Sequence, residues 1–135
     1  MSIDKIKILM VDDMESMRGI IKATLKSIGA SDVVVAENGY EAIKLLSKSH
    51  FDLIISDWDM PKVTGLQLLG YVRENEAYRH IPFILLTASK DTSRVKSAIS
   101  LDVSDYLSKP FTPKALEQKI IRIIKKYDLP KRVSL

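Results

Sequence analysis

The stretch from Phe51 to Pro61 constrains the fold of this chain more than any other; it reads Phe-Asp-Leu-Ile-Ile-Ser-Asp-Trp-Asp-Met-Pro. Its apolar run, Leu53 to Ile55, is bounded by polar residues and has the length of a strand buried on both faces. The strand should end at Asp57, because Pro61 has no backbone N–H with which to continue a ladder. A carboxylate at the C-terminal end of a central strand in an open α/β sheet lies in the crevice where ligands bind. Asp57 is therefore the first candidate for chemistry, although such a residue on its own can equally cap a turn.

The rest of the chain alternates between short apolar runs and amphipathic patterns. The runs predict strands over residues 6–11, 33–36, 53–57, 81–87 and 105–108. The patterns predict helices over residues 17–28, 39–47, 65–75, 91–101 and 113–127. Five alternating pairs favour an α/β fold, a flavodoxin-like doubly wound parallel sheet with strand order 2-1-3-4-5. All five strands then end at one edge of the sheet.

Length and composition indicate one ordinary globular domain. We expect it to span residues 1–135, with a core over about residues 5–127 and a polar tail over 128–135. Without cysteine, neither a disulfide framework nor a thiolate site is possible. The charged N-terminus lacks an apolar signal core, and no run approaches the length of a membrane span. We expect a cytoplasmic, monomeric protein that binds no nucleic acid and does not insert into a membrane.

Charge is distributed unevenly along the chain. Residues 1–89 hold 10 Lys/Arg and 12 Asp/Glu, whereas residues 90–135 hold 11 Lys/Arg and 5 Asp/Glu. A basic C-terminal third favours association with an acidic partner surface. The alternative, a solvated face without a partner, stays open on charge pattern alone.

Polar and charged residues follow the predicted strands at their C-terminal ends. They are Asp12 and Asp13 after the first strand, Asp57 after the third, Thr87 after the fourth and Lys109 after the fifth. Because the first and third strands are neighbours in the predicted order, three carboxylates converge. At ~5 Å and an effective dielectric constant of ~20, each like-charged pair costs about 3 kcal/mol. Such a site needs a cation, and oxygen ligands without His or Cys favour Mg²⁺.

A carboxylate, Mg²⁺, a lysine and a hydroxyl around one point are the parts that phosphoryl transfer to an aspartate requires. Asp57 would be the nucleophile, and the metal and Lys109 would stabilise charge on the phosphoryl group. Thr87 could donate a hydrogen bond to a phosphoryl oxygen. Taken singly, each residue has a simpler reading: Asp13 as a helix cap, Thr87 as a strand-end residue, Lys109 as a solvated side chain. The simultaneous placement of all of them at strand ends favours the chemical reading.

Four motifs together resemble the receiver domain of two-component response regulators, the CheY-like superfamily, over residues 5–127. They are Asp12-Asp13, Asp57-Trp58-Asp59-Met60-Pro61, Thr87-Ala88 and Tyr106-Leu107-Ser108-Lys109-Pro110-Phe111. The resemblance implies that Asp57 accepts a phosphoryl group from a histidine kinase or a small donor such as acetyl phosphate. It also implies that Asp13, Asp57 and the Asp59 backbone carbonyl ligate Mg²⁺, that Asp12 acts mainly through water, and that the Lys109–Pro110 bond is cis.

The resemblance further implies a switch. When the phosphoryl group draws in the Thr87 hydroxyl, Tyr106 can rotate inward and change a surface formed by the fourth helix, fifth strand and fifth helix. In this sequence that surface would carry Lys90, Val95, Tyr106, Lys119 and Arg122. We expect its target to be acidic.

Because no effector domain follows in this sequence, the stand-alone chemotaxis regulators of the family are the nearest comparison. These act on the flagellar motor switch protein, and a phosphatase can reset them. Four positions depart from the usual family residues and put the phosphoryl lifetime or loop conformation in question: Asp59, Lys62, Ser89 and Asp102.

Other readings remain open. A phosphate sink or a regulator outside chemotaxis would carry the same motifs. A haloacid-dehalogenase-type phosphatase also uses an apolar-Asp-x-Asp pattern, which Ile54 to Asp59 would fit, but there the nucleophile leads the chain and here the acidic pair comes first. We expect no enzymatic turnover beyond phosphorylation and dephosphorylation of Asp57 itself.

Overall fold

The computed structural model describes residues 3–88 and 91–130, and within them strands and helices alternate along the chain. The strands are β1 (Lys7–Val11), β2 (Asp32–Ala36), β3 (Leu53–Asp57), β4 (Phe83–Thr87) and β5 (Asp105–Ser108). The α-helices are α1 (Glu15–Ser27), α2 (Gly39–Lys48), α3 (Gly65–Glu74), α4 (Thr92–Ser100) and α5 (Pro113–Tyr127). A short 3₁₀ turn, Ile3–Lys5, precedes β1. No helix in the described ranges combines the length and apolar character that crossing a membrane requires.

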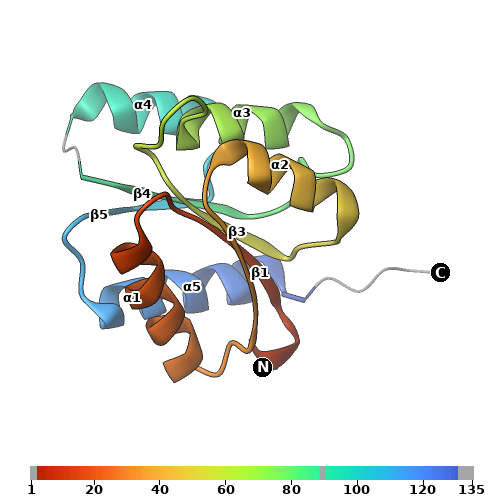
Figure 1. Ribbon diagram of the computed structural model, residues 1–135, viewed down its shortest axis with the longest axis vertical. Coiled ribbons are helices and arrows are strands. Elements are labelled where there is room, and N and C mark those ends of the chain that lie inside the picture. Colours follow the sequence, from red (N-terminus) through yellow and green to blue (C-terminus); the bar gives the residue numbers. More distant parts are fainter. Residues whose placement is uncertain (1–2, 89–90, 131–135) are drawn as a thin grey trace.

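The strands form one parallel sheet in the order β2-β1-β3-β4-β5, as the sequence predicts. Helices α2, α3 and α4 cover one face of this sheet, and α1 and α5 cover the other (Figure 1). The fourth strand is shorter than predicted and begins at Phe83 instead of residue 81. Pro82 has no N–H for the ladder, although its carbonyl still accepts a hydrogen bond from the Ile54 N–H at 3.0 Å.

Side-chain caps mark the starts of α2, α3, α4 and α5, whereas α1 begins without one. The Asn38 carboxamide accepts a hydrogen bond from the Glu41 N–H at 2.9 Å and so caps the start of α2. At α3, Thr64 and Gln67 form a reciprocal capping box. Thr112 caps α5, whose first residue is a proline. Because all the strands run parallel, the loops between strand ends and these helix starts lie at the same edge of the sheet.

Two hydrophobic layers fill the space between sheet and helices. Leu9, Ile54 and Leu85 face α2 and α3, whereas Ile8, Ile55 and Ile84 face α1 and α5. Strands β3 and β4 are buried at every position, as expected for central strands covered on both faces. Among the α-helices, α4 contributes least to this core: only Ala98 is buried within it, and Ile99, an apolar residue of this predicted helix, is 63% exposed.

Arg73, on α3, holds together the loops at the opposite edge of the sheet, where β4 and β5 begin. Its guanidinium donates hydrogen bonds to the carbonyls of Asp102, Arg79 and Ile81 at 2.9, 3.1 and 2.7 Å. Burial lowers the pKa of Arg73, and the Asp102 carboxylate opposes this shift. Asp102 stands at φ 57°, a left-handed conformation that Asp tolerates better than most residues. Asp102 is one of the four positions that differ from the usual family residue. The hydrogen bond from Arg73 to its carbonyl holds it in this conformation.

Replacing Arg73 by Met keeps the aliphatic stem but removes the donors to three carbonyls. Because the partly buried Ile81 carbonyl would lose its donor along with the two exposed carbonyls, we expect the free energy of unfolding to fall by about 1–3 kcal/mol. Urea unfolding followed by circular dichroism measures this loss. Arg79→Met, at an exposed side chain nearby, is the control and should change stability by less than about 0.5 kcal/mol. Equal stability of the two variants would contradict the assigned role.

Candidate functional site

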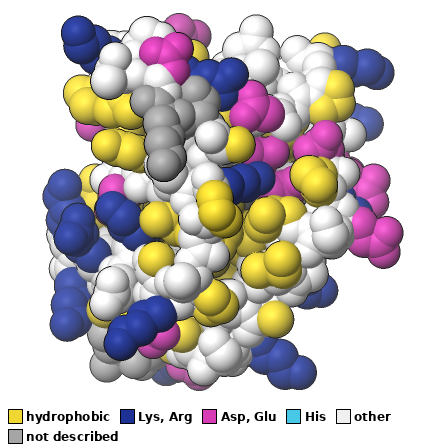
Figure 2. Space-filling model, turned by 90° about the vertical axis from the view of Figure 1, so that its left-hand side faces the viewer, with side chains coloured by type: hydrophobic (Ala, Val, Ile, Leu, Met, Phe, Trp, Pro, Cys, Tyr) yellow, Lys and Arg dark blue, Asp and Glu magenta, His cyan; other side chains and the backbone are white. Residues whose placement is uncertain are grey.

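The predicted site residues do meet at one edge of the sheet. Asp12 follows β1, Asp57 ends β3, Thr87 ends β4 and Lys109 follows β5, so parallel pairing brings their backbones to the same end. Figure 2 faces this end of the molecule, where acidic side chains gather beside a basic one. The arrangement follows from topology, since only the order β2-β1-β3 makes the ends of β1 and β3 adjacent.

Asp12 is fully buried and positioned by its own loop. Its Oδ1 accepts a hydrogen bond from the Met14 N–H at 2.9 Å, and its carbonyl accepts one from Arg18 Nη1 at 2.9 Å. Its Oδ2 is buried without a hydrogen-bond partner and lies 3.6 Å from Lys109 Nζ. A buried carboxylate oxygen in this state is costly unless a positive charge faces it.

Asp57 and Lys109 form a close, largely buried pair. Lys109 Nζ donates a hydrogen bond to Asp57 Oδ1 at 3.0 Å, and the two side chains are 14% and 5% exposed. Burial raises the pKa of Asp57, and the neighbouring Asp12 charge adds to this, whereas the hydrogen bond and charge of Lys109 lower it. The Asp57 carboxylate therefore lies in surroundings that favour neutralisation of its charge.

Thr87 and Lys109 are fixed to each other through the backbone. The Lys109 N–H donates a hydrogen bond to the Thr87 carbonyl at 2.7 Å, which extends the pairing of β4 with β5 by one residue. The Lys109–Pro110 peptide bond is cis, as the resemblance implies. Thr87 itself is buried, at the end of the strand beside the one that carries Asp57.

Three carboxylates could hold a metal ion. Asp12, Asp13 and Asp57 each offer one oxygen, and these oxygens lie within 4.8 Å of one another. Asp12 and Asp57 are buried, whereas Asp13 is exposed at the mouth of the site. An all-oxygen set with an exposed side, where water can complete the coordination, suits Mg²⁺. The unpartnered Asp12 Oδ2 is a second sign that this cluster fits a cation.

The Asp59 side chain does not join that cluster. Its carboxylate accepts a hydrogen bond from Arg94 Nη1 at 2.9 Å, on α4, and the Arg94 guanidinium also lies over the Trp58 ring at 5.0 Å from its centroid. Sequence reasoning identified Asp59 as an unusual fourth acid but not Arg94 as its partner. No spacing signal could have found the pair, because 35 positions separate the two residues.

This geometry can be compared with known proteins. Residues 8–121 match the model of the response regulator receiver domain. The chain belongs to the response regulator receiver family. It is 38% identical over 120 residues to the chemotaxis protein CheY of Pseudomonas aeruginosa, covering 89% of this chain and 97% of that protein. The structure is similar to that of chemotaxis response regulator CheY4 of Vibrio cholerae, with a TM-score of 0.81, 33% identity and coverage of 87% of this chain and 98% of that one.

A second solved relative is relevant to the acidic cluster. The receiver domain of sensor histidine kinase PA1611 from Pseudomonas aeruginosa has a magnesium ion coordinated in its active site cleft. This chain superimposes on it with a TM-score of 0.79 and 28% identity, covering 88% of this chain and 97% of that one. The family match confirms the predicted resemblance, and the fold similarity confirms the predicted architecture.

The receiver face predicted as an output surface is partly assembled by one carboxylate that the sequence did not single out. Asp105, on β5, accepts a hydrogen bond from Lys119 Nζ at 2.9 Å and lies 3.7 Å from Arg122 Nη1. Next to it, Tyr106 is 37% exposed, and it counts among the exposed large apolar residues of this structure. Val95 is half-buried on α4, and Lys90 lies outside the described residues.

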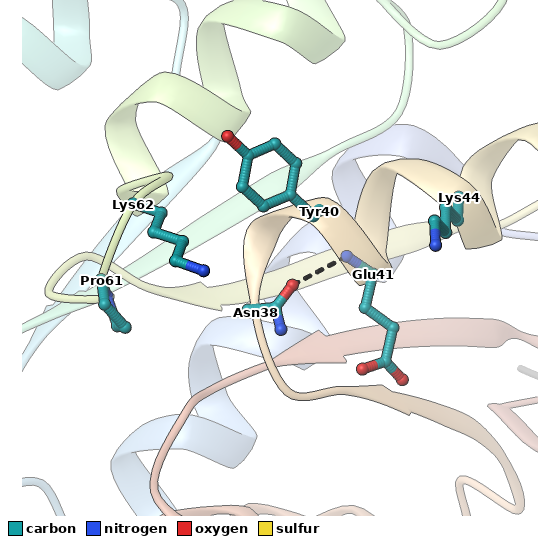
Figure 3. A pocket seen from close by; sticks show the side chains of 6 residues that line it. All are labelled: Asn38, Tyr40, Glu41, Lys44, Pro61 and Lys62. Carbon is teal, nitrogen blue, oxygen red and sulfur yellow. Dashed lines mark hydrogen bonds between the residues drawn. The ribbon is translucent and has the colours of Figure 1, made fainter.

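A separate open hollow of about 520 Å³ lies between the start of α2 and the loop after β3 (Figure 3). Asn38, Tyr40 and Glu41 line it from α2 and its cap, and Lys62 reaches toward them from the opposite loop. Lys62 takes a φ of 67°, which is a left-handed conformation. At this position the chain therefore carries a lysine, instead of the usual family residue, in a left-handed turn. None of the acidic cluster lines this hollow.

Proposed function

We propose that this receiver is a response regulator whose Asp57 is phosphorylated in the presence of Mg²⁺ by a histidine kinase or a small donor, and that it acts in chemotaxis. The observation that carries the proposal is the convergence of Asp57, Lys109 and two further carboxylates at one sheet edge. The chemotaxis assignment is supported by relatives named for that process, which the chain matches over nearly their whole length. A phosphatase that resets the protein fits the same scheme.

The chain's own residues account for the transfer step. An Asp57 carboxylate oxygen attacks phosphorus, a new O–P bond forms, and the bond to the donor's leaving group breaks, so that acetate leaves when acetyl phosphate is the donor. Lys109 Nζ, which already donates to Asp57 Oδ1, is placed to donate to a phosphoryl oxygen instead. Thr87, at the end of the adjoining strand, would donate to a second oxygen.

Asp12, Asp13 and Asp57 would hold Mg²⁺. Bound there, the ion would neutralise charge on the phosphoryl oxygens as they approach the carboxylates. The fold contributes by keeping one carboxylate oxygen from each of these three side chains within 4.8 Å of the others. The Asp59 carbonyl stays a predicted further ligand.

The output would be read on the face that carries Tyr106, Lys119 and Arg122. Because two cations, Lys119 and Arg122, share the one Asp105 carboxylate, this group keeps a net positive charge. An acidic segment, as on a flagellar motor switch protein, is the partner that this surface would bind. Such a protein would work in the cytoplasm, and its covalent chemistry would be limited to its own aspartyl phosphate.

Incubation with acetyl phosphate and MgCl₂, followed by intact-protein mass spectrometry, tests the assignment. We expect a gain of one phosphoryl group in the wild-type protein and none in Asp57→Asn. Asp52→Asn, at a buried aspartate on the opposite edge that bonds the Lys7 N–H, is the matched control and should still be phosphorylated. Sustained release of phosphate from an added phosphate ester would instead indicate a phosphatase of the haloacid-dehalogenase type.

Magnesium should also stabilise the fold. A ligand that binds only the native state raises the free energy of unfolding by about 1.4 kcal/mol when its concentration is ten times its dissociation constant. Urea unfolding with and without MgCl₂ measures the gain, and Asp13→Asn should reduce it because one of the three carboxylates is lost. An unchanged midpoint at every magnesium concentration would argue against a metal at this cluster.

A further inference from the structure

Among the α-helices, α4 is the one least anchored by apolar packing. Only Ala98 is buried along it, and its first two residues, Thr92 and Ser93, are exposed. The side chain of Asp91 caps this helix by accepting a hydrogen bond from the Ser93 N–H at 2.9 Å, which orders its first turn. The position of the first half of α4 therefore depends on polar contacts with neighbouring elements.

Arg94 makes such a contact at two points. Its Nη1 donates a hydrogen bond to Asp59 Oδ1 at 2.9 Å, and its guanidinium stacks over the Trp58 ring at 5.0 Å from the centroid. Both partners lie on the loop directly after Asp57, the last residue of β3. The Arg94 side chain is 33% exposed and the Asp59 side chain 51% exposed, so the ion pair lies at the surface and its strength depends also on the stacking of Arg94 over Trp58.

The pair also changes the electrostatics of the site edge. Asp59 is a fourth carboxylate, two residues after Asp57 of the cluster of Asp12, Asp13 and Asp57. Its negative charge is paired with the Arg94 guanidinium. Planar arginine fits both a carboxylate and an aromatic face, which lysine does less well. The contact thus neutralises Asp59 and fixes the loop and the helix relative to each other.

We propose that Arg94 is a positioning residue with two effects. It ties the first half of α4 to the segment from Asp57 to Thr64, the phosphoacceptor loop. It also screens the Asp59 charge from the acidic cluster of Asp12, Asp13 and Asp57. The first part concerns the resting protein alone, and the second rests on the function proposed above. Since α4 forms one side of the predicted output face, the tie links that face to the loop that carries Asp57.

Hydrogen–deuterium exchange of the full chain, without any phosphodonor, tests the tie. We expect exchange in residues 92–98 to rise about three- to tenfold in Arg94→Gln and in Asp59→Asn, and no further in the double variant, because both changes break one contact. Arg94→Lys should restore part of the protection. Lys96→Gln, an exposed lysine on the same helix, is the charge-matched control and should leave exchange unchanged. Unchanged exchange in Arg94→Gln, or effects that multiply in the double variant, would overturn the tie.

Titration with MgCl₂, followed by Trp58 fluorescence, tests the screening. With Asp59 left unpaired, Arg94→Gln should bind magnesium about two- to fivefold more tightly than Lys96→Gln. Equal affinities in these two variants would refute the screening role. The exchange experiment needs no phosphorylation. If exchange changed as expected in the variants but the wild-type protein gained no phosphoryl group, the result would contradict only the proposed function.

Discussion

Replacing Lys109 by Gln should lower the rate of Asp57 phosphorylation by about 10²–10³-fold. The Lys109 ammonium lies 3.0 Å from Asp57 Oδ1 and 3.6 Å from Asp12 Oδ2, the two buried carboxylates of the site. In the transfer step it would stabilise negative charge on a phosphoryl oxygen, and removing one such preorganised donor typically costs two to three orders of magnitude. The measurement is the time course of phosphoprotein formation from acetyl phosphate at fixed MgCl₂.

The control for this variant is Lys125→Gln, which removes the same charge from an exposed position on α5. It should leave the rate within about twofold of the wild-type value, because exposed charges beyond a Debye length are screened. A Lys109→Gln protein that is phosphorylated at a near-normal rate would show that the lysine only balances charge in the resting site. Circular dichroism of both variants establishes that each is folded.

Gly65→Ala should lower the free energy of unfolding by about 2–4 kcal/mol and should also slow the phosphorylation of Asp57. Gly65 begins α3, and its N–H donates a hydrogen bond to the Trp58 carbonyl at 2.8 Å. A Cβ at this position would overlap the Asp57 carbonyl oxygen and stand 2.8 Å from Trp58 Cα. Since these are backbone atoms of the phosphoacceptor loop, they can yield only by moving Asp57.

Gly19→Ala is the matched control. Gly19 lies within α1, where a Cβ meets nothing within 4 Å, so alanine should stabilise the helix by about 0.5–1 kcal/mol. Urea unfolding compares the two variants, and acetyl phosphate labelling compares their rates. If both substitutions had the same small effect on stability, the close approach of α3 to the end of β3 would not constrain Asp57.

The sequence by itself determined the order of elements and the edge at which Asp12, Asp13, Asp57, Thr87 and Lys109 meet. Apolar runs such as Leu53 to Ile55 specify buried strands, and local caps such as Asn38 specify where helices begin. Parallel pairing then brings the strand ends together without further information. This is why the site could be predicted from motifs far apart along the chain.

Only the tertiary structure decided which side chains are paired across elements. It placed Arg94 on Asp59, Arg73 under the Asp102 carbonyl, and Lys119 on Asp105. It also left Ile99 exposed, although Ile99 is an apolar residue of a predicted helix. Local periodicity determines which face of a helix is buried. Contacts between surface side chains depend instead on how loops and helices pack, and residues far apart along the chain contribute to that packing.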